Sequence, residues 1–255
     1  MSLSLAFSTL PFSDLDAADL AALCRRHHMA AEVRCRPDGS CPVSPDLPVC
    51  SAGSSVCVLG TEDDATVEKW CGQFRSLFRQ GIRGVRVFLG NFRRKYSDPE
   101  RPLSPDGICR ILRKFCGTGP DILIETHNEY ATSDALVPLL REVGHPRLGV
   151  IWDCLHPLED GEDIARTWEA LCADIRHIHI KDALPTDDPD SHDWRYTRLG
   201  EGTVPLGELL RMTRRDGYAG CYSLEWESPW RPELAGLYDT PDALLGAYSA
   251  FMASL

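Results

Sequence analysis

The sequence lacks the features that would assign it to a membrane or to an oxidising compartment. Its 11 cysteines form no CxxC pair, are odd in number and follow no regular spacing. No apolar segment reaches the roughly 18 residues of a membrane span, and no apolar signal segment opens the chain. These absences favour a cytoplasmic protein with reduced thiols and no membrane partner.

Positive charge is also scarce. The chain has 27 Lys and Arg against 38 Asp and Glu, a formal net charge of −11, which repels nucleic acid backbones and anionic membranes. We therefore expect no nucleic acid partner. No GxGxxG motif follows any predicted strand, which disfavours a dinucleotide-binding fold.

What the sequence does contain is an alternation of strand and helix patterns along 255 residues. Short β-branched or apolar runs predict eight strands: Leu3–Ser8, Ala31–Arg34, Val49–Ala52, Val85–Leu89, Ile122–Glu125, Leu148–Trp152, Ile175–Ile180 and Tyr222–Trp226. Helical periodicity with caps, Ser133 and Thr240 among them, predicts helices over Asp14–His28, Asp63–Arg79, Pro105–Phe115, Asp134–Val143, Asp160–Cys172, Val204–Asp216 and Pro241–Met252. This order favours one α/β domain over residues 1–255, a TIM (β/α)8 barrel.

One helix of a regular barrel is missing from this pattern. The segment Cys35–Pro48, CRPDGSCPVSPDLP, is rich in Pro, Gly and Ser and has no helical periodicity, so it predicts a loop between the second and third strands. That flank of the barrel would be less covered. We expect it to be available to a partner subunit in a homo-oligomer.

The stretch RHIHIKDA, residues 176–183, has a polar face where a buried strand should be apolar. With a period of two, Ile178 and Ile180 share one face, while His177, His179 and Lys181 share the other. The strand is predicted to be the seventh of the barrel, with His179 facing the interior. His177 would lie one layer deeper, hydrogen-bonded and not bound to metal.

The carboxyl ends of the later strands carry ionisable residues, and in a TIM barrel these ends form the active site. The stretches ILIETHNEY, GVIWDCLHP and YSLEWES add carboxylates and imidazoles to those of the seventh strand: Glu125, His127, Asp153, His156, Glu225 and Glu227. Each alone could be an ion-pair partner, a helix cap or a satisfied histidine. Together, so many buried charges favour a divalent ion such as Mn²⁺, Mg²⁺, Co²⁺ or Zn²⁺.

The motifs ETHN, WDCLHP, HIHIKDA, LGEGTVPLGELL and GYAGCYSLEWE resemble, in order, those of the xylose isomerase-like TIM barrels of the sugar phosphate isomerase/epimerase family. The resemblance covers residues 81–230. It implies one divalent ion held by four residues and a substrate contact at His156, the ligands being Glu125, Asp153, His179 and Glu225. His127 is a further predicted substrate contact.

Two departures leave the substrate open. Ketose 3-epimerases place an Arg six residues after the metal His, where this chain has Pro185, and the Thr-His after Glu125 is more similar to inosose and 3-dehydroshikimate dehydratases. The prediction is a metal-dependent isomerase or epimerase of a small polyhydroxylated substrate, acting through an enediolate, with a dehydratase as the alternative. An endonuclease IV-like nuclease and a non-catalytic binding barrel are remote alternatives.

The predicted chemistry assigns roles to the remaining polar residues. Glu125 and Glu225 would exchange the proton as acid and base, and Lys181 would stabilise an oxyanion or pair with Asp153 or Glu225. Asp182 would orient His179 or Lys181. In the loop LPTDDPDSHDWRYTRLGEG, further substrate contacts are predicted at Trp194, Arg195 and Arg198.

Overall fold

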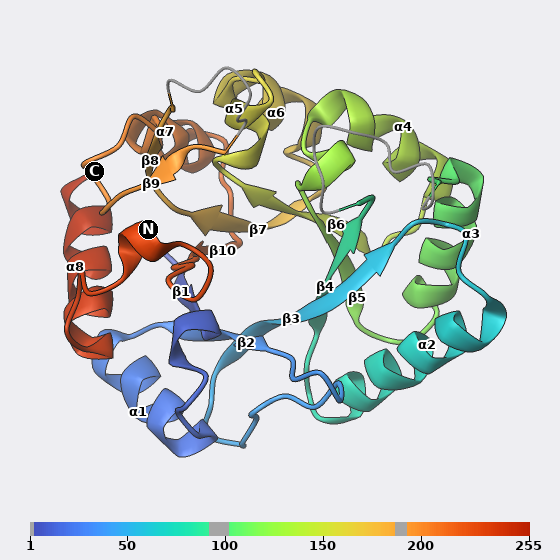
Figure 1. Ribbon diagram of the computed structural model, residues 1–255, viewed down its shortest axis with the longest axis horizontal. Helices are drawn as coiled ribbons and strands as arrows, with labels where there is room; N and C mark the ends of the chain where they lie inside the picture. Colours follow the sequence, from blue (N-terminus) through green and yellow to red (C-terminus); the bar gives the residue numbers. More distant parts are fainter. Residues whose placement is uncertain (1–2, 92–101, 187–192) are drawn as a thin grey trace.

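The computed structural model describes residues 3–91, 102–186 and 193–255. These residues form a closed barrel of parallel strands surrounded by helices (Figure 1). The barrel strands are β1 (Leu5–Ser8), β2 (Ala30–Arg34), β3 (Val49–Val58), β4 (Gly84–Leu89), β5 (Asp121–Glu125), β6 (Leu148–Asp153), β7 (Ile175–Ile180) and β10 (Cys221–Leu224). Because β10 pairs with both β7 and β1, the sheet closes, and the predicted TIM barrel is confirmed.

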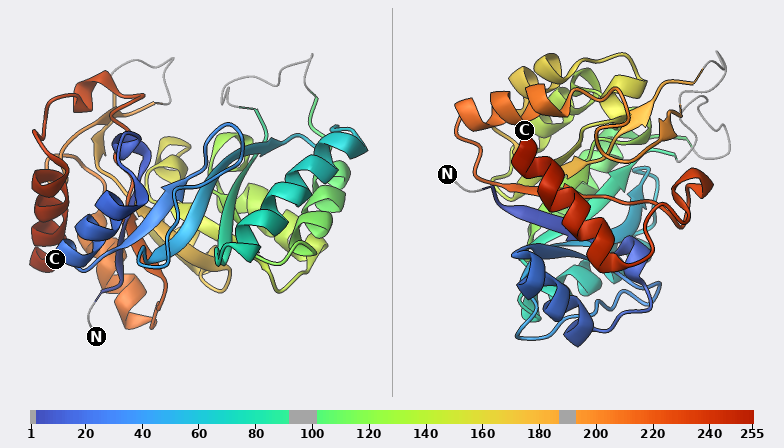
Figure 2. Two further views of the ribbon diagram at one scale, coloured as in Figure 1. Left: turned by 90° about the horizontal axis from the view of Figure 1, so that it is seen from below. Right: turned by 90° about the vertical axis from the view of Figure 1, so that its left-hand side faces the viewer.

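The helices lie outside the sheet and cover its apolar outer face. They are α1 (Ala17–His27), α2 (Asp64–Arg79), α3 (Pro105–Cys116), α4 (Ser133–Val143), α5 (His156–Glu159), α6 (Ile164–Leu171), α7 (Leu206–Arg215) and α8 (Pro241–Ser254), with 3-10 turns η1 (Leu10–Phe12), η2 (Asn128–Tyr130) and η3 (Pro232–Leu234). A two-stranded sheet of β8 (Ala183–Leu184) and β9 (Arg195–Tyr196) lies, with η3, at the face opposite the start of the chain (Figure 2). Within the described ranges, no helix has both the length and the apolar character to cross a membrane.

Several boundaries differ from the predicted ones for local reasons. The predicted helix Asp160–Cys172 is shorter in the structure, where α6 begins only at Ile164, because Gly161 adopts φ +82 and Asp163 is the N-cap residue. The short helix α5 before it was not predicted. Thr132, and not Ser133, is the N-cap residue of α4, while Thr240 caps α8 as predicted. The strand boundaries differ from the predicted ones by only a few residues, except in β3. This strand continues through a small, polar Gly-Ser-Ser segment to Val58.

The loop predicted at residues 35–48 is confirmed, since no helix lies between β2 and β3 in this fully described segment. Between α1 and α2, Figure 1 shows loop where the other flanks carry helices. A cavity of about 630 Å³ lies there, lined in part by apolar side chains such as Leu20, Trp70, Phe74 and Trp230. The predicted cover by a partner subunit stays a prediction.

The polar stretch at residues 176–180 lies in β7 with the predicted orientation. Ile178 and Ile180 are fully buried and belong to the same apolar cluster as Trp168 of α6 and Leu209 of α7. His179 instead contacts Glu32 of β2, a strand that does not neighbour β7 in the sheet, so the contact crosses the barrel interior. The apolar core therefore lies between sheet and helices, and the interior is available for polar side chains.

Candidate metal centre

Four predicted ligands meet at the carboxyl-terminal mouth of the barrel. Glu125 ends β5, Asp153 ends β6, His179 lies in β7, and Glu225 directly follows β10. One ligand atom from each residue lies within 4.8 Å of the others, and all four residues are at most 5% exposed. The donors of one ion with bonds of about 2.0–2.2 Å cannot lie much more than 4 Å apart, so this group needs only a small contraction.

His179 is oriented with one nitrogen toward the group. Its Nε2 lies 2.9 Å from Glu32 Oε2, a carboxylate that can only accept, so Nε2 carries the proton. Its Nδ1 makes no hydrogen bond to any described residue and lies 3.2 Å from Glu225 Oε2 and 3.7 Å from Asp153 Oδ2. Glu32 thus selects the tautomer that leaves Nδ1 available to a metal.

Arg86 is an interior residue of β4 that the sequence analysis missed. The side chain is 2% exposed, and its Nη1 donates to Glu125 Oε2 at 2.9 Å and to Glu225 Oε1 at 3.1 Å. Gly53 of β3 packs closely against this pair of charges, since a Cβ there would lie 3.3 Å from Glu32 Oε1 and 3.4 Å from Arg86 Nη2. Both Arg86 and Glu32 could have been found from sequence, because each is a single charged residue between apolar neighbours in a predicted strand: VRV around Arg86 and AEV around Glu32.

Lys181 lies directly after β7 and contacts the carboxylates of the same group. Its Nζ is 2.7 Å from Asp153 Oδ2, 2.6 Å from Glu225 Oε2 and 2.5 Å from Glu227 Oε1. Lys181 thus pairs with both Asp153 and Glu225, which were predicted as alternative partners. This ammonium is buried, and its three partners raise its pKa although burial alone would lower it, so it remains charged.

The buried charges of the site do not balance. Four buried carboxylates face two permanent cations, Arg86 and Lys181, which leaves two negative charges in excess; the carboxylates belong to Glu32, Glu125, Asp153 and Glu225. Burial raises the pKa of Glu125 to about 7 against the opposing charge of Arg86. For Glu225 and His179 burial acts against the charged forms, but their mutual attraction lowers the pKa of Glu225 and raises that of His179. Without a metal, protons therefore supply the missing positive charge.

A divalent ion fits these residues on both chemistry and charge. Three carboxylates and one imidazole are a donor set for Mn²⁺, Mg²⁺, Co²⁺ or Zn²⁺. Two positive charges would neutralise the excess that protons otherwise hold. Glu125, Asp153, His179 and Glu225 are accordingly the residues that could hold the ion.

Of the other predicted substrate contacts, the two histidines lie beside this group, as Lys181 does. His156 is buried, with Nδ1 2.8 Å from the Thr126 carbonyl oxygen and 3.8 Å from Glu125 Oε1. The His127 ring is half-buried, and its centroid is 4.5 Å from that of His156.

The contacts predicted in the following loop lie apart from the group. The backbone of Trp194 donates to Glu159, Arg195 is exposed on β9, and Arg198 donates to the Leu237 carbonyl oxygen at 3.1 Å. Residues 187–192 of that loop lie outside the described part of the chain.

The role predicted for Asp182 is wrong. Its side chain points away from His179 and Lys181, because residues of opposite parity lie on opposite faces of an extended chain. The carboxylate accepts four backbone N–H groups of the following loop, those of Ala183, Gly200, Gly202 and Val204, at 2.8–3.2 Å. Asp182 therefore holds the loop after β9 in place.

Arg34, at the end of β2, adds a cation near the mouth that the sequence analysis did not identify. It lines the 630 Å³ cavity and donates to Ser55 Oγ at 3.1 Å. Partial burial and the Arg86 charge lower its pKa, while Glu225 and Glu125 oppose the shift. Arg34 thus lines the cavity and also lies within electrostatic range of Glu125 and Glu225.

Comparison with known proteins supports the assignment of the fold. The model of the family described as xylose isomerase-like TIM barrel matches residues 5–245. A 3-dehydroshikimate dehydratase of Bacillus anthracis is 29% identical over 184 residues, which are 66% of this chain and 64% of that protein.

Solved structures with the same fold have sequences that differ widely from this one. The probable 3-DHS dehydratase AsbF from Bacillus anthracis is 17% identical with a TM-score of 0.77, covering 98% of this chain and 99% of its own. The IolI protein with a bound zinc atom is 16% identical with a TM-score of 0.71, covering 99% and 96%. The 3-keto-D-glucoside 4-epimerase YcjR from E. coli is 17% identical with a TM-score of 0.69, covering 99% and 100%.

Proposed function

The chain belongs to the xylose isomerase-like TIM barrel family. Within this family, we propose that it is a divalent-metal-dependent dehydratase. Its substrate would be a small hydroxylated keto acid of the 3-dehydroshikimate type, which loses a proton next to the carbonyl and then a β-hydroxyl group. The observation that carries the proposal is the compact, buried donor group with two uncompensated negative charges. The 29% identical dehydratase supports elimination over the other reactions of the fold.

Glu125 is the better candidate for the base. In the metal-free site burial raises the pKa of Glu125 to about 7, so of the two carboxylates it holds a proton more strongly, although a bound ion would lower the pKa of both. Glu225 has a pKa held well below its ordinary range by His179 and Lys181, despite its burial, so it is a weak base and a good permanent ligand. The two predicted acid–base residues therefore take different roles in this proposal.

The remaining steps use groups that are already in place. A bound divalent ion would supply Lewis-acid polarisation of the substrate carbonyl. Glu125 takes the proton from the adjacent carbon, and the C–H electron pair forms the new C=C bond as the C–O bond to the β-hydroxyl breaks. Protonated Glu125 can return its proton to the departing hydroxide, which leaves as water, and the Lys181 ammonium stabilises negative charge on the substrate oxygen.

Arg34 supports an acid as the substrate. Arg34 lines the cavity, and its charge interacts with those of Glu125 and Glu225. A substrate carboxylate is the group that a guanidinium binds best, through paired hydrogen bonds. A neutral ketose would leave this cation without a partner in the substrate.

Epimerisation is the second candidate. One nitrogen of Arg86 holds both Glu125 and Glu225, at 2.9 and 3.1 Å, so two carboxylates face the same small volume. If Glu225 returned a proton to the opposite face of the carbon that Glu125 deprotonates, the substrate would be epimerised without loss of water. The low pKa of Glu225 disfavours this exchange.

The test is to supply Mn²⁺ and incubate the protein with 3-dehydroshikimate and, separately, with ketoses and inososes in deuterated water. Loss of water from the acid, seen as the absorbance of an aromatic dihydroxybenzoate, is the expected result. Deuterium in a recovered ketose without loss of water would establish the epimerase instead.

Two variants and a control complete the test. Asp153→Ala should abolish both metal binding and activity, and Arg34→Gln should raise KM for the acid about tenfold or more while the metal stays bound. The control is Asp163→Ala, which removes only a helix cap at α6. A wild type that binds no divalent ion and acts on none of these substrates would refute the proposal.

A further inference from the structure

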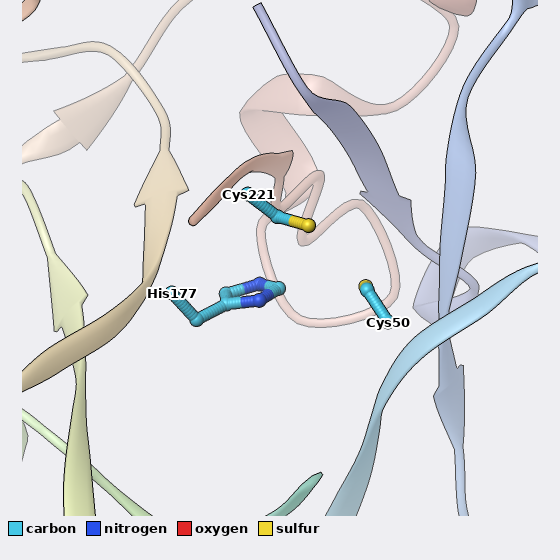
Figure 3. A group of neighbouring side chains, drawn as sticks. All are labelled: Cys50, His177 and Cys221. Atoms are coloured by element: carbon cyan, nitrogen blue, oxygen red, sulfur yellow. The ribbon is translucent and has the colours of Figure 1, made fainter. Parts of the chain in front are cut away.

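A second group of metal-ligating side chains lies at the opposite end of the barrel interior. Cys50 is near the start of β3, His177 near the start of β7, and Cys221 is the first residue of β10. Figure 3 shows the three side chains pointing toward one another from these three strands. In a parallel barrel the strand starts form the face opposite the mouth, so this group is separate from the candidate centre above.

The group is compact enough for a single ion. One ligand atom from each residue lies within 4.8 Å of the others. Tetrahedral coordination with Zn–S bonds of about 2.3 Å places two sulfur atoms just under 4 Å apart, so a small inward movement suffices. His177 is 2% exposed, while Cys50 and Cys221 are half-buried, which leaves a route from solvent at this face.

Thiolates, not thiols, bind metal ions, so the two cysteines would release the protons that they still hold when an ion binds.

His177 connects this group to the mouth through one residue. Its Nε2 lies 3.3 Å from Glu32 Oε2, the same oxygen that lies 2.9 Å from Nε2 of His179. The barrel interior is thus one polar column, with Glu32 between the two donor groups.

We propose that Cys50, His177 and Cys221 bind a second divalent ion, Zn²⁺, at the amino-terminal end of the barrel, with water as the fourth ligand. For His177 this replaces the prediction from sequence, which had it hydrogen-bonded and not bound to metal. Two thiolates and an imidazole select Zn²⁺ over the harder ions that suit three carboxylates. The ion would join β3, β7 and β10 and stabilise the barrel, and it has no part in the proposed elimination. This inference does not depend on the proposed function.

The test is a Co²⁺ titration of reduced Asp153→Ala protein, in which the mouth site is disabled. Cobalt absorbs strongly in the near ultraviolet only when a thiolate binds it, so the expected result is one equivalent with this absorbance. In the same background Cys221→Ala and Cys50→Ala should each remove it. Cys35→Ala should not, although Cys35 belongs to another close pair of thiols, with Sγ of Cys41 2.8 Å away.

A second measurement uses the unaltered protein and so does not depend on how the variants fold. Alkylation of Cys221 by iodoacetamide should slow at least tenfold when Zn²⁺ is added, while alkylation of the exposed Cys172 stays unchanged. Three results would overturn the proposal: no thiolate absorbance, absorbance that survives Cys221→Ala, or a Cys50–Cys221 disulfide that persists under reductant.

Discussion

Replacing Glu32 by Gln tests whether the negative charge behind His179 strengthens metal binding. The substitution keeps the size of the side chain and removes the charge that holds the His179 Nε2 proton at 2.9 Å. Loss of such a partner behind a metal ligand costs about 10- to 100-fold in metal affinity, or about 1.4–2.7 kcal/mol. The fold should persist, because the amide oxygen can still accept this hydrogen bond.

The loss of metal affinity can be measured by thermal unfolding. Saturating Mn²⁺, which prefers carboxylates to thiolates, stabilises the folded protein in proportion to the logarithm of its affinity. With about 2–4 °C per kcal/mol for a chain of this size, the Mn²⁺-induced rise in Tm should be about 3–10 °C smaller in Glu32→Gln than in wild type. Direct titration with Mn²⁺ gives the affinity independently.

Glu162→Gln is the matched control. Glu162 is also a buried glutamate, 6% exposed, but its carboxylate accepts hydrogen bonds from Ser133 and Thr167 between α4 and α6. This variant should lose stability with and without metal, and its Mn²⁺ affinity should equal that of wild type. The reasoning fails if Glu32→Gln binds Mn²⁺ as wild type does, or if both variants lose affinity equally.

Three further predictions concern pH, packing and oxidation. Mn²⁺ affinity should rise as pH increases through about 7, because burial raises the pKa of Glu125 to about 7 and the proton bound below that pH competes with the ion; calorimetric titrations on both sides of pH 7 test this. Gly107→Ala should lower the free energy of unfolding by about 1–3 kcal/mol, since its Cβ would lie 1.9 Å from a backbone carbonyl oxygen. Gly72→Ala should instead raise the free energy of unfolding by about 0.5–1 kcal/mol, because α2 leaves open space at that position. Urea unfolding measures both effects. Mild oxidation should join Cys35 to Cys41 before other pairs, because their sulfur atoms lie 2.8 Å apart, and a peptide map with both thiols free would contradict this.

Hydrophobic pattern predicts this fold well because each barrel strand is short and bounded by turn residues. The strand predicted at Ile175–Ile180 has the bounds of β7, and the loop predicted at residues 35–48 is a loop. The predicted and observed helix boundaries differ where a single residue determines the start of the helix. Gly161 at φ +82 and the Asp163 cap move the start of the predicted helix Asp160–Cys172 to Ile164, and the Asp16 side chain caps α1 later than its pattern begins.

The site was only partly predictable for a different reason. The rule that active-site residues lie at strand ends identifies Glu125 and Asp153, which end their strands. It passes over Glu32 and Arg86, which lie inside strands between apolar neighbours. Such residues can be interpreted from sequence only by asking where a buried charge finds its partners, and these include residues across the barrel, His179 for Glu32 and Glu225 for Arg86.

The location of the apolar core explains how the barrel tolerates this polar interior. Most TIM barrels fill the interior with layers of branched apolar side chains. Here Ile178 and Ile180 of β7 pack outward into the cluster shared with the helices, while His177 (Figure 3) and His179, which contacts Glu32 across the barrel, face inward. Stability therefore comes mainly from the layer between sheet and helices, and the interior must satisfy a different condition, which is charge balance. A net excess of two negative charges at the mouth means that either protons or a divalent ion must be bound there, so binding of metal at this site is coupled to release of protons.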